Sequence, residues 1–344
     1  MNRRKTIHLL LAVGIGVPAL IACPGCPPFR DPSVPGDIRK VTEPALGGKY
    51  WLYVPTTYDP AKEWALILVC HGTNPFDYAG RQIADWAKLA EERQFIVAAP
   101  LLEGTSAFPP SAARQLVLQR KDERMLLACV RHLQGAYNIA ADRVFMTCWS
   151  AGSYAVLHTG LCNPHVFRAL AVLQGNFKPE YFTEAARTID PFQPVYVLYG
   201  SNDILTGKHG RRCVDWLNEH GAAVTHEEIG GPHKNHPKQA YAFFERVVRK
   251  VPWLHILAGT ENTEDPLTVS FKVRSSFEPQ RYEWSFGDEA PTSPVARPVH
   301  TYARPGEYTV TLQVETPPGK TVRRAVEITL PQSRGLPLRF DGNY

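Results

Sequence analysis

The fold is decided by the stretch RVFMTCWSAGSY, residues 143–154. Its first half is an apolar run typical of a buried strand, and its second half passes through a serine into a helix-like segment. A sharp turn from strand to helix raises one side chain above the sheet, and the crowded backbone there requires small residues two places to either side. Cys148 and Gly152 are small enough. We therefore expect Ser150 at the apex of such a turn and the Cys148 side chain inside packed structure.

Strand-like runs alternate with helix-like segments from about residue 47 to residue 250. The runs ALILVC (65–70) and VYVLYG (195–200) are apolar almost throughout, which is typical of strands buried on both faces. Other segments, such as 121–137 and 237–251, have helical spacing. This alternation predicts an α/β fold with a doubly wound, mostly parallel sheet, whose reactive groups gather at the carboxyl ends of the strands.

Three residues suited to nucleophilic catalysis follow strand ends in the order Ser150, Asp203, His233. A serine hydroxyl is a weak nucleophile at neutral pH, so it needs a histidine to take its proton and a carboxylate to orient that histidine. Asp190 and Asp215 are alternatives for the acid, but the first precedes its strand and the second falls within a helical segment. The order and placement predict Ser150, Asp203 and His233 as a catalytic triad.

The choice of base lies between His233 and His236, which follow the same strand. His233 comes directly after Gly-Gly-Pro, which suits a rigid turn that projects one side chain. His236 precedes Pro237, which biases it towards an extended backbone at the start of a helix. We therefore favour His233 as the base, with His236 at the rim of the site as the alternative.

Two backbone amides are candidates for an oxyanion hole, the pair of donors that stabilises the negative oxygen of a tetrahedral intermediate. The amide of Ala151 lies at the start of the helix that follows the serine, and the amide of Thr73 lies in the loop after the strand ending at Cys70. His71 is expected to hold this loop in place and not to act as a second base.

Five motifs carry a resemblance to a known family. They are YVP (53–55), ILVCHGTN (67–74), KDERMLLACVRHLQGAYNIAADRVFMTCWSAGS (121–153), VLYGSND (197–203) and GGPH (230–233). Through them, residues 40–250 resemble esterases of the α/β-hydrolase superfamily, in the group that includes polyhydroxybutyrate depolymerase-like and feruloyl or acetylxylan esterase-like enzymes. The resemblance implies ester hydrolysis through an acyl-enzyme on the triad Ser150, Asp203 and His233, with no metal or organic cofactor.

The chain departs from the family pattern at two places. Cys148 replaces the usual glycine, and HKNHP (233–237) stands where the family has Trp-Pro after the histidine. The expected substrates are polymer-linked or small acyl esters, such as polysaccharide-linked acyl groups or hydroxyalkanoates. The segment 101–115 and the residues near Phe177 and Tyr181 are expected to shape the pocket, but they match no specificity signature.

Two other functions remain as alternatives. A prolyl-type serine peptidase uses the same order of triad residues, although the chain shows no long propeller of the kind such enzymes carry. A catalytically silent binding or adhesion lipoprotein would use the same folded bodies only to recognise envelope polymers.

A second resemblance covers about residues 258–331. The alternation in YTVTLQVE (308–315) and the Pro-Gly turn at 305–306 predict an all-β sandwich. The landmarks WSFGD (284–288) and HTY (300–302) are similar to those of the polycystic-kidney-disease-type (PKD) domain. Its tryptophan and tyrosines are expected in the core, and the domain is expected to act as a spacer or to contact carbohydrate or protein.

The N-terminus has the features of an export signal, because residues 1–22 combine a basic start with a short apolar run. The stretch LIAC (20–23) resembles the bacterial lipobox, so Cys23 is the expected lipidation site, with a plain secretory signal as the alternative. Residues 23–40 form a proline-rich tether and residues 332–344 a C-terminal tail. The chain is thus expected to be exported and lipid-anchored to a membrane of the bacterial cell envelope.

Composition limits the remaining possibilities. The 344 residues, 44% hydrophobic and 21% charged, are enough for about two domains, expected at 41–252 and 258–331. The formal net charge is +5, and three of the positive charges lie in the expected signal, so the charge does not favour a nucleic-acid partner.

Cysteine usage leaves the redox state open. Seven cysteines are present, and an exported chain permits disulfides. Cys70 and Cys148 end apolar runs and are typical of small buried hydrophobic residues. The remaining candidates for pairing, in any of several combinations, are Cys26, Cys129, Cys162 and Cys213.

Overall fold

The computed structural model describes residues 35–105, 110–190, 192–259, 265–317, 319 and 321–331. The expected signal peptide, Cys23, Cys26, most of the tether and the C-terminal tail lie outside the described residues. Among the described residues, none of the helices combines the length and apolarity that crossing a bilayer requires.

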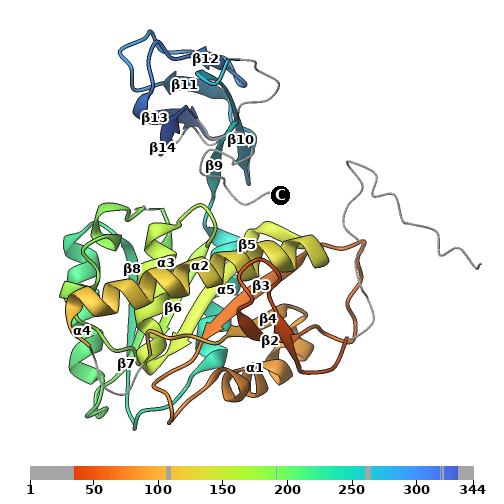
Figure 1. Cartoon of the computed structure of the whole chain (residues 1–344), viewed down its shortest axis with the longest axis vertical. Coiled ribbons are helices and arrows are strands. Elements are labelled where there is room, and N and C mark those ends of the chain that lie inside the picture. Colours follow the sequence, from red (N-terminus) through yellow and green to blue (C-terminus); the bar gives the residue numbers. More distant parts are fainter. Residues whose placement is uncertain are drawn as a thin grey trace, which may run out of the picture.

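The larger body is built on a mixed sheet of eight strands within the described part of the chain (Figure 1). These are β1 (Arg39–Thr42), β2 (Lys49–Tyr53), β3 (Trp64–Cys70), β4 (Ile96–Pro100), β5 (Ile139–Trp149), β6 (Ala169–Leu173), β7 (Pro194–Gly200) and β8 (Ala223–Ile229). Their order is β1-β2-β4-β3-β5-β6-β7-β8, with β3 to β8 parallel to one another and β1 and β2 joining antiparallel at one end. The prediction of a mostly parallel sheet is confirmed.

Helices cover both faces of this sheet. They are α1 (Ala79–Arg93), α2 (Ala112–Ala136), α3 (Ser153–Cys162), α4 (Gly207–Glu219) and α5 (Pro237–Lys250), with short 3₁₀ turns η1 (Ser150–Gly152), η2 (Pro179–Tyr181) and η3 (Ala185–Arg187). One core contains the apolar sides of α2, α3 and α4, and the other contains those of α1 and α5. Successive residues of β3 alternate between the two cores, because side chains of a strand point to opposite faces. This explains why the central strands are apolar throughout.

The C-terminal unit is a sandwich of two antiparallel sheets. Its strands are β9 (Leu254–Gly259), β10 (Thr268–Ser275), β11 (Arg281–Ser285), β12 (Val299–Thr301), β13 (Gly306–Glu315) and β14 (Thr321–Leu330), in the orders β12-β10-β9 and β11-β13-β14. Trp284 and Tyr302 are almost fully buried in its core, as the sequence predicted. The sandwich begins at Leu254, four residues earlier than expected, because Leu254 and Ile256 fill this core.

The sandwich joins the larger body at the amino ends of the parallel strands. Arg168, the residue before β6, donates from Nη2 to the carbonyl oxygen of Val251, just after α5, at 2.6 Å. The helix α5 begins near the carboxyl ends of the strands and runs back across the sheet. The strand β9, which follows it, therefore starts near the amino ends of the strands. Figure 1 shows the sandwich standing off one end of the larger body.

The described cysteines are thiols. Cys129 and Cys213 are buried and Cys162 is half-buried, and none of these three forms a disulfide. Pairing among them, which the sequence left open, is therefore absent from the described part of the chain, and Cys26 lies outside it.

Candidate active site

Ser150 sits on the turn between β5 and α3. Its φ is +53°, in the left-handed region that non-glycine residues rarely adopt and that often marks a functional site. A Cβ added at Gly152 would collide with the carbonyl oxygen of Cys70, so the turn requires a glycine there. The predicted sharp turn with Ser150 at its apex is what the backbone shows.

Cys148 lies inside β5 and is 1% exposed. Its Sγ contacts the carbonyl oxygen of Ala171 at 3.9 Å, and burial raises the pKa of the thiol to about 12. The prediction that this side chain faces packed structure is confirmed. A thiol with so high a pKa has almost no thiolate at neutral pH, so it is a poor candidate for a nucleophile.

Asp203 and His233 form a partly buried pair. Nδ1 of His233 lies 2.7 Å from Oδ2 of Asp203, and the carboxylate side chain is fully buried. The amides of Leu205 and Thr206 donate to Oδ1 at 2.9 and 3.1 Å, and the Thr206 hydroxyl donates to Oδ2. Burial alone raises the pKa of Asp203, but the hydrogen bonds from Thr206 and His233 outweigh it and leave the pKa below its usual value. The carboxylate is therefore ionised and fixed in place.

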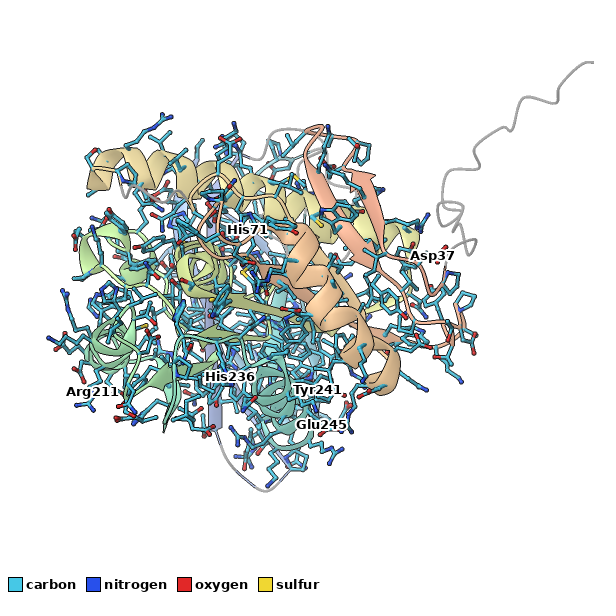
Figure 2. The ribbon with its side chains drawn as sticks, turned by 90° about the horizontal axis from the view of Figure 1, so that it is seen from below. Asp37, His71, Arg211, His236, Tyr241 and Glu245 are labelled. Atoms are coloured by element: carbon cyan, nitrogen blue, oxygen red, sulfur yellow. The ribbon has the colours of Figure 1, made fainter. Side chains whose placement is uncertain are left out.

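The alternative base, His236, and the alternative acids, Asp190 and Asp215, do not belong to the Asp203–His233 pair. His236 is the residue directly before α5, its ring makes no hydrogen bond with Asp203, and burial lowers its pKa. Figure 2 shows His236 with Tyr241 and Glu245, which follow it along α5. Asp190 lines a cavity beside the sandwich, and Asp215 lies within α4.

The hydroxyl of Ser150 donates to Oδ1 of Asn176 at 3.3 Å, and the amide of Asn176 donates to the carbonyl oxygen of Ser150 at 3.2 Å. In this structure no hydrogen bond joins Ser150 to His233. The His233 ring instead stacks on the ring of Trp149, the neighbour of Ser150, with centroids 5.0 Å apart. Catalytic hydrogen bonds often tighten only when substrate is bound, so the geometry is compatible with proton transfer after the hydroxyl turns away from Asn176.

The loop that carries Thr73 packs against the serine turn. A Cβ at Gly72 would lie 3.3 Å from the Cβ of Ser150, which shows how closely the two turns approach. His71 holds this loop: its Nδ1 donates to the Gly72 carbonyl oxygen at 2.9 Å and its Nε2 accepts from the Leu102 amide at 3.0 Å. Burial lowers the pKa of His71, which favours the neutral ring that these two bonds require. The amides of Thr73 and Ala151 thus belong to two turns in contact.

A polar chain that the sequence did not reveal joins this loop to the turn of His233. Oδ2 of Asp77 accepts from the Gly72 amide at 2.5 Å and from Nε2 of Gln82 at 2.9 Å. Oε1 of Gln82 then accepts from Nδ2 of Asn235 at 2.9 Å. His71 and His236, on the two segments that this chain connects, are both labelled in Figure 2.

The strand order, the helices on both faces and the serine turn after β5 define the larger body as an α/β-hydrolase fold followed by a small all-β domain. The family model of the PKD domain matches residues 253–330, so the C-terminal unit is a PKD domain. A search of curated proteins found no match to this sequence.

Solved structures with a similar fold include hydrolases of several kinds. The chain is similar to a CE1 ferulic acid esterase of Anaeromyces mucronatus, at 15% identity and a TM-score of 0.47, over 65% of this chain and 94% of that one. It is similar to the fluorophosphonate-binding serine hydrolase FphF of Staphylococcus aureus, at 14% identity and a TM-score of 0.47, over 63% and 99%. It is also similar to dipeptidyl peptidase 4 of Porphyromonas gingivalis, at 15% identity and a TM-score of 0.44, over 62% of this chain and only 35% of that one.

Proposed function

We propose that the protein is a serine carboxylic-ester hydrolase that works through an acyl-enzyme on Ser150, with His233 as base and Asp203 as the acid that orients it. The observation that carries this proposal is the Asp203–His233 pair, whose Oδ2 and Nδ1 atoms are 2.7 Å apart, with the His233 ring stacked on Trp149, the neighbour of a serine in a left-handed turn. A nucleophile, a base and an orienting acid are the parts that acyl transfer requires.

The mechanism follows from these positions. Asp203 holds the proton of His233 on Nδ1, so Nε2 keeps the lone pair that takes the proton of Ser150 as Oγ attacks the ester carbonyl carbon. The amides of Thr73 and Ala151 donate to the resulting oxyanion, where a single donor is typically worth about 3 kcal/mol. The C–O bond to the alcohol then breaks, and the alcohol leaves with the proton from His233. Water repeats the attack on the acyl group and releases the acid.

Exposed apolar side chains on the two loops beside the site support an ester with a hydrophobic part. Phe76 and Tyr78 follow the Thr73 loop and are 75% and 57% exposed, while Ile204 and Leu205 follow Asp203 and are 96% and 63% exposed. Such side chains can contact an apolar polymer or acyl group that extends out of the site. Polymer-linked hydroxyalkanoates and polysaccharide-linked acyl groups both fit this description.

The proposed setting is the bacterial cell envelope, with the chain anchored by lipid on Cys23. The proline-rich tether would hold the folded part off the membrane. The PKD domain joins the larger body at the amino ends of the parallel strands, whereas Ser150 lies at their carboxyl ends. The domain can therefore contact carbohydrate or protein without covering the site. Incorporation of labelled fatty acid into the wild type but not into Cys23→Ala in a bacterial host tests the anchor, and an unlabelled wild type would overturn it.

The function itself is tested with a substrate panel on the purified protein and on Ser150→Ala. The panel holds short p-nitrophenyl esters, a feruloyl ester, an acetylated sugar, a hydroxyalkanoate oligomer and a prolyl peptide. We expect ester turnover that Ser150→Ala removes. Peptide turnover without ester turnover would indicate the peptidase, and neither turnover nor labelling by a fluorophosphonate probe would indicate a silent binding protein.

A further inference from the structure

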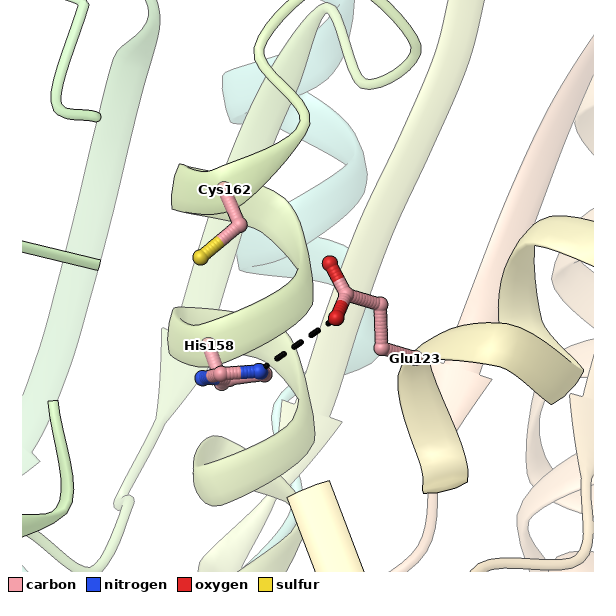
Figure 3. Close-up of side chains that lie close together, drawn as sticks. All are labelled: Glu123, His158 and Cys162. Carbon is pink, nitrogen blue, oxygen red and sulfur yellow. Dashed lines mark ion pairs between the residues drawn. The ribbon is translucent and has the colours of Figure 1, made fainter. Parts of the chain in front are cut away.

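A second group of reactive side chains lies between α2 and α3, apart from the candidate active site. Glu123 comes from α2, and His158 and Cys162 lie four residues apart on one face of α3 (Figure 3). One potential ligand atom from each of the three lies within 4.8 Å of the other two. The proposed function uses none of these residues.

The buried ring of His158, which lacks hydrogen bonds, points to a ligand. Its side chain is only 1% exposed, yet neither ring nitrogen makes a hydrogen bond within the described part of the chain. Nε2 is directed at Oε2 of Glu123, 3.5 Å away, and lies 4.0 Å from Oε2 of Glu184. Buried polar groups are nearly always satisfied, because burying them unpaired is costly. An imidazole buried this way between carboxylates indicates that a cation belongs beside it.

We propose that Glu123, His158 and Cys162 bind a zinc ion. Imidazole nitrogen, thiolate sulfur and carboxylate oxygen are the three ligand types that zinc takes in proteins. The thiolate of Cys162 and the carboxylate of Glu123 supply two negative charges for the divalent ion. Zinc prefers four ligands, and water can supply the fourth beside these three.

Neighbouring side chains already hold the carboxylates. Nδ2 of Asn163 donates to Oε1 of Glu123 at 2.6 Å, which leaves Oε2 directed towards His158. Arg120 pairs with Glu184 through Nε at 3.1 Å. Partners of this kind orient the ligands of metal sites and tune their affinity.

Cys162 is the member of the cluster that lies beside a cavity. Cys162 lines a cavity of about 450 Å³ between the larger body and the PKD domain, where His255 and Arg323 line it as well. A metal site needs a route of entry in addition to its ligands.

The zinc ion would serve structure and not ester chemistry. His158 follows Ser150 by eight residues, a distance of about 12 Å along a helix at 1.5 Å per residue. Zinc bound here would join α2 to α3, the helix that directly follows the serine turn. The competing explanation is that Glu123 and Glu184 alone hold His158, without metal.

Metal binding by the full chain tests the proposal. The protein is stripped with a chelator, titrated with Zn²⁺, and in parallel with Co²⁺, whose absorption reports tetrahedral geometry and thiolate ligation. We expect one Zn²⁺ per chain, and a Co²⁺ complex with a thiolate charge-transfer band. Cys162→Ala should remove that band and weaken zinc binding by more than the tenfold to hundredfold, roughly, that losing an outer-shell partner costs. Glu123→Gln should weaken it similarly, and Cys213→Ala, a helix cysteine outside the cluster, should leave both unchanged.

Equal zinc binding by the wild type and Cys162→Ala would overturn the proposal, as would a wild type that binds no zinc. The second result would support a His158 held by the two carboxylates alone. If Cys162→Ala does not fold, as judged by circular dichroism, the wild type supplies the answer. Iodoacetamide should then alkylate Cys162 more slowly in the presence of Zn²⁺, as measured by peptide mass spectrometry, and an unchanged rate would contradict the site.

Discussion

Gln174 holds the turn that carries His233 from both sides. Its Nε2 donates to the carbonyl oxygen of Pro232 at 3.3 Å, and its Oε1 accepts from the amide of Lys234. Gln174 follows β6 and has a φ of +45°. Its side chain is fixed because the residue is 0% exposed and both ends of its amide are hydrogen-bonded. The position of the proposed base thus depends on a glutamine that is 59 residues earlier in the chain.

Gln174→Met should therefore lower kcat by much more than a substitution elsewhere in the core that costs the same free energy of unfolding. Methionine keeps the volume but loses both hydrogen bonds, so the His233 turn shifts, and a displacement of about 1 Å can cost on the order of a hundredfold in rate. Gln193→Met is the matched control, because Gln193 is also buried and bonds two backbone carbonyls, those of Gly160 and Phe167. Steady-state kinetics and urea unfolding should show similar losses of stability but a loss of kcat only in Gln174→Met.

The nucleophile is tested by replacing Ser150 and Cys148, one at a time, with alanine. Ser150→Ala should remove nearly all ester turnover, by a factor on the order of 10³ or more. Cys148→Ala should leave turnover largely intact, because the thiol faces the core and its pKa is raised to about 12. A fluorophosphonate should label Ser150 in a peptide map. Inactivation by a thiol reagent that modifies Cys148 would reverse the assignment.

The base is tested by a similar comparison of two histidines. His233→Ala should lower kcat by a factor on the order of 10³, and combining it with Ser150→Ala should add little, because the two residues act as a unit. His236→Ala should cost far less, since His236 does not contact Asp203. Steady-state assays at one pH, about pH 8, measure the ranking. The opposite ranking would move the base to His236.

The stability of the protein should fall in acid partly because of His71. Burial lowers its pKa in the folded state, whereas the unfolded chain takes up this proton near pH 6.5. Below that pH the unfolded state binds more protons, so the free energy of unfolding decreases as pH falls. Urea midpoints between about pH 7.5 and about pH 5 should drop less in His71→Gln than in wild type.

A control separates this effect from a general change of charge. His226→Gln, at an exposed position of β8, should keep the wild-type slope. Other histidines, such as the half-buried His209, also have a pKa lowered by burial, so the slope should become smaller in His71→Gln but should not vanish. Identical slopes in His71→Gln and wild type would contradict the account.

The fold was predictable because its signals are local. Each central strand carries an apolar run, and the requirement for a small residue at Gly152 can be inferred from a few neighbouring letters. The start of α2 at Ala112, nine residues before the expected segment, had a signal in Ser111, whose side chain accepts from the amide of Arg114.

The supports of the site were not predictable, because they depend on contacts between distant residues. Asn235 and Gln82 are 153 residues apart, and Asn176 is 26 residues from the serine that donates to it. Amides of this kind occur throughout a sequence, and nothing nearby distinguishes one that will meet a catalytic turn. The three candidate triad residues could be named from the order of strand ends, but the side chains that hold them needed the three-dimensional structure.

Thr206 offers the sharpest test of how Asp203 is held. Its hydroxyl donates to Oδ2 of Asp203 and lies 3.3 Å from Nδ1 of His233, so it touches both members of the pair. Thr206→Val keeps the shape of the side chain and removes the hydroxyl. The pKa of Asp203 should then rise, because burial, which raises it, is opposed by one hydrogen bond fewer. A protonated Asp203 cannot stabilise the imidazolium of His233, so the acid limb of the pH–kcat profile should move to higher pH. At neutral pH kcat should fall about tenfold, with KM little changed, well short of the loss expected for His233→Ala.

Thr206→Ser restores a hydroxyl at the same position and should restore both kcat and the acid limb, which a merely structural role for the threonine methyl group would not allow. An acid limb that stays in place in Thr206→Val would show that the remaining hydrogen bonds, from Leu205, His233 and the amide of residue 206, are sufficient to keep Asp203 ionised.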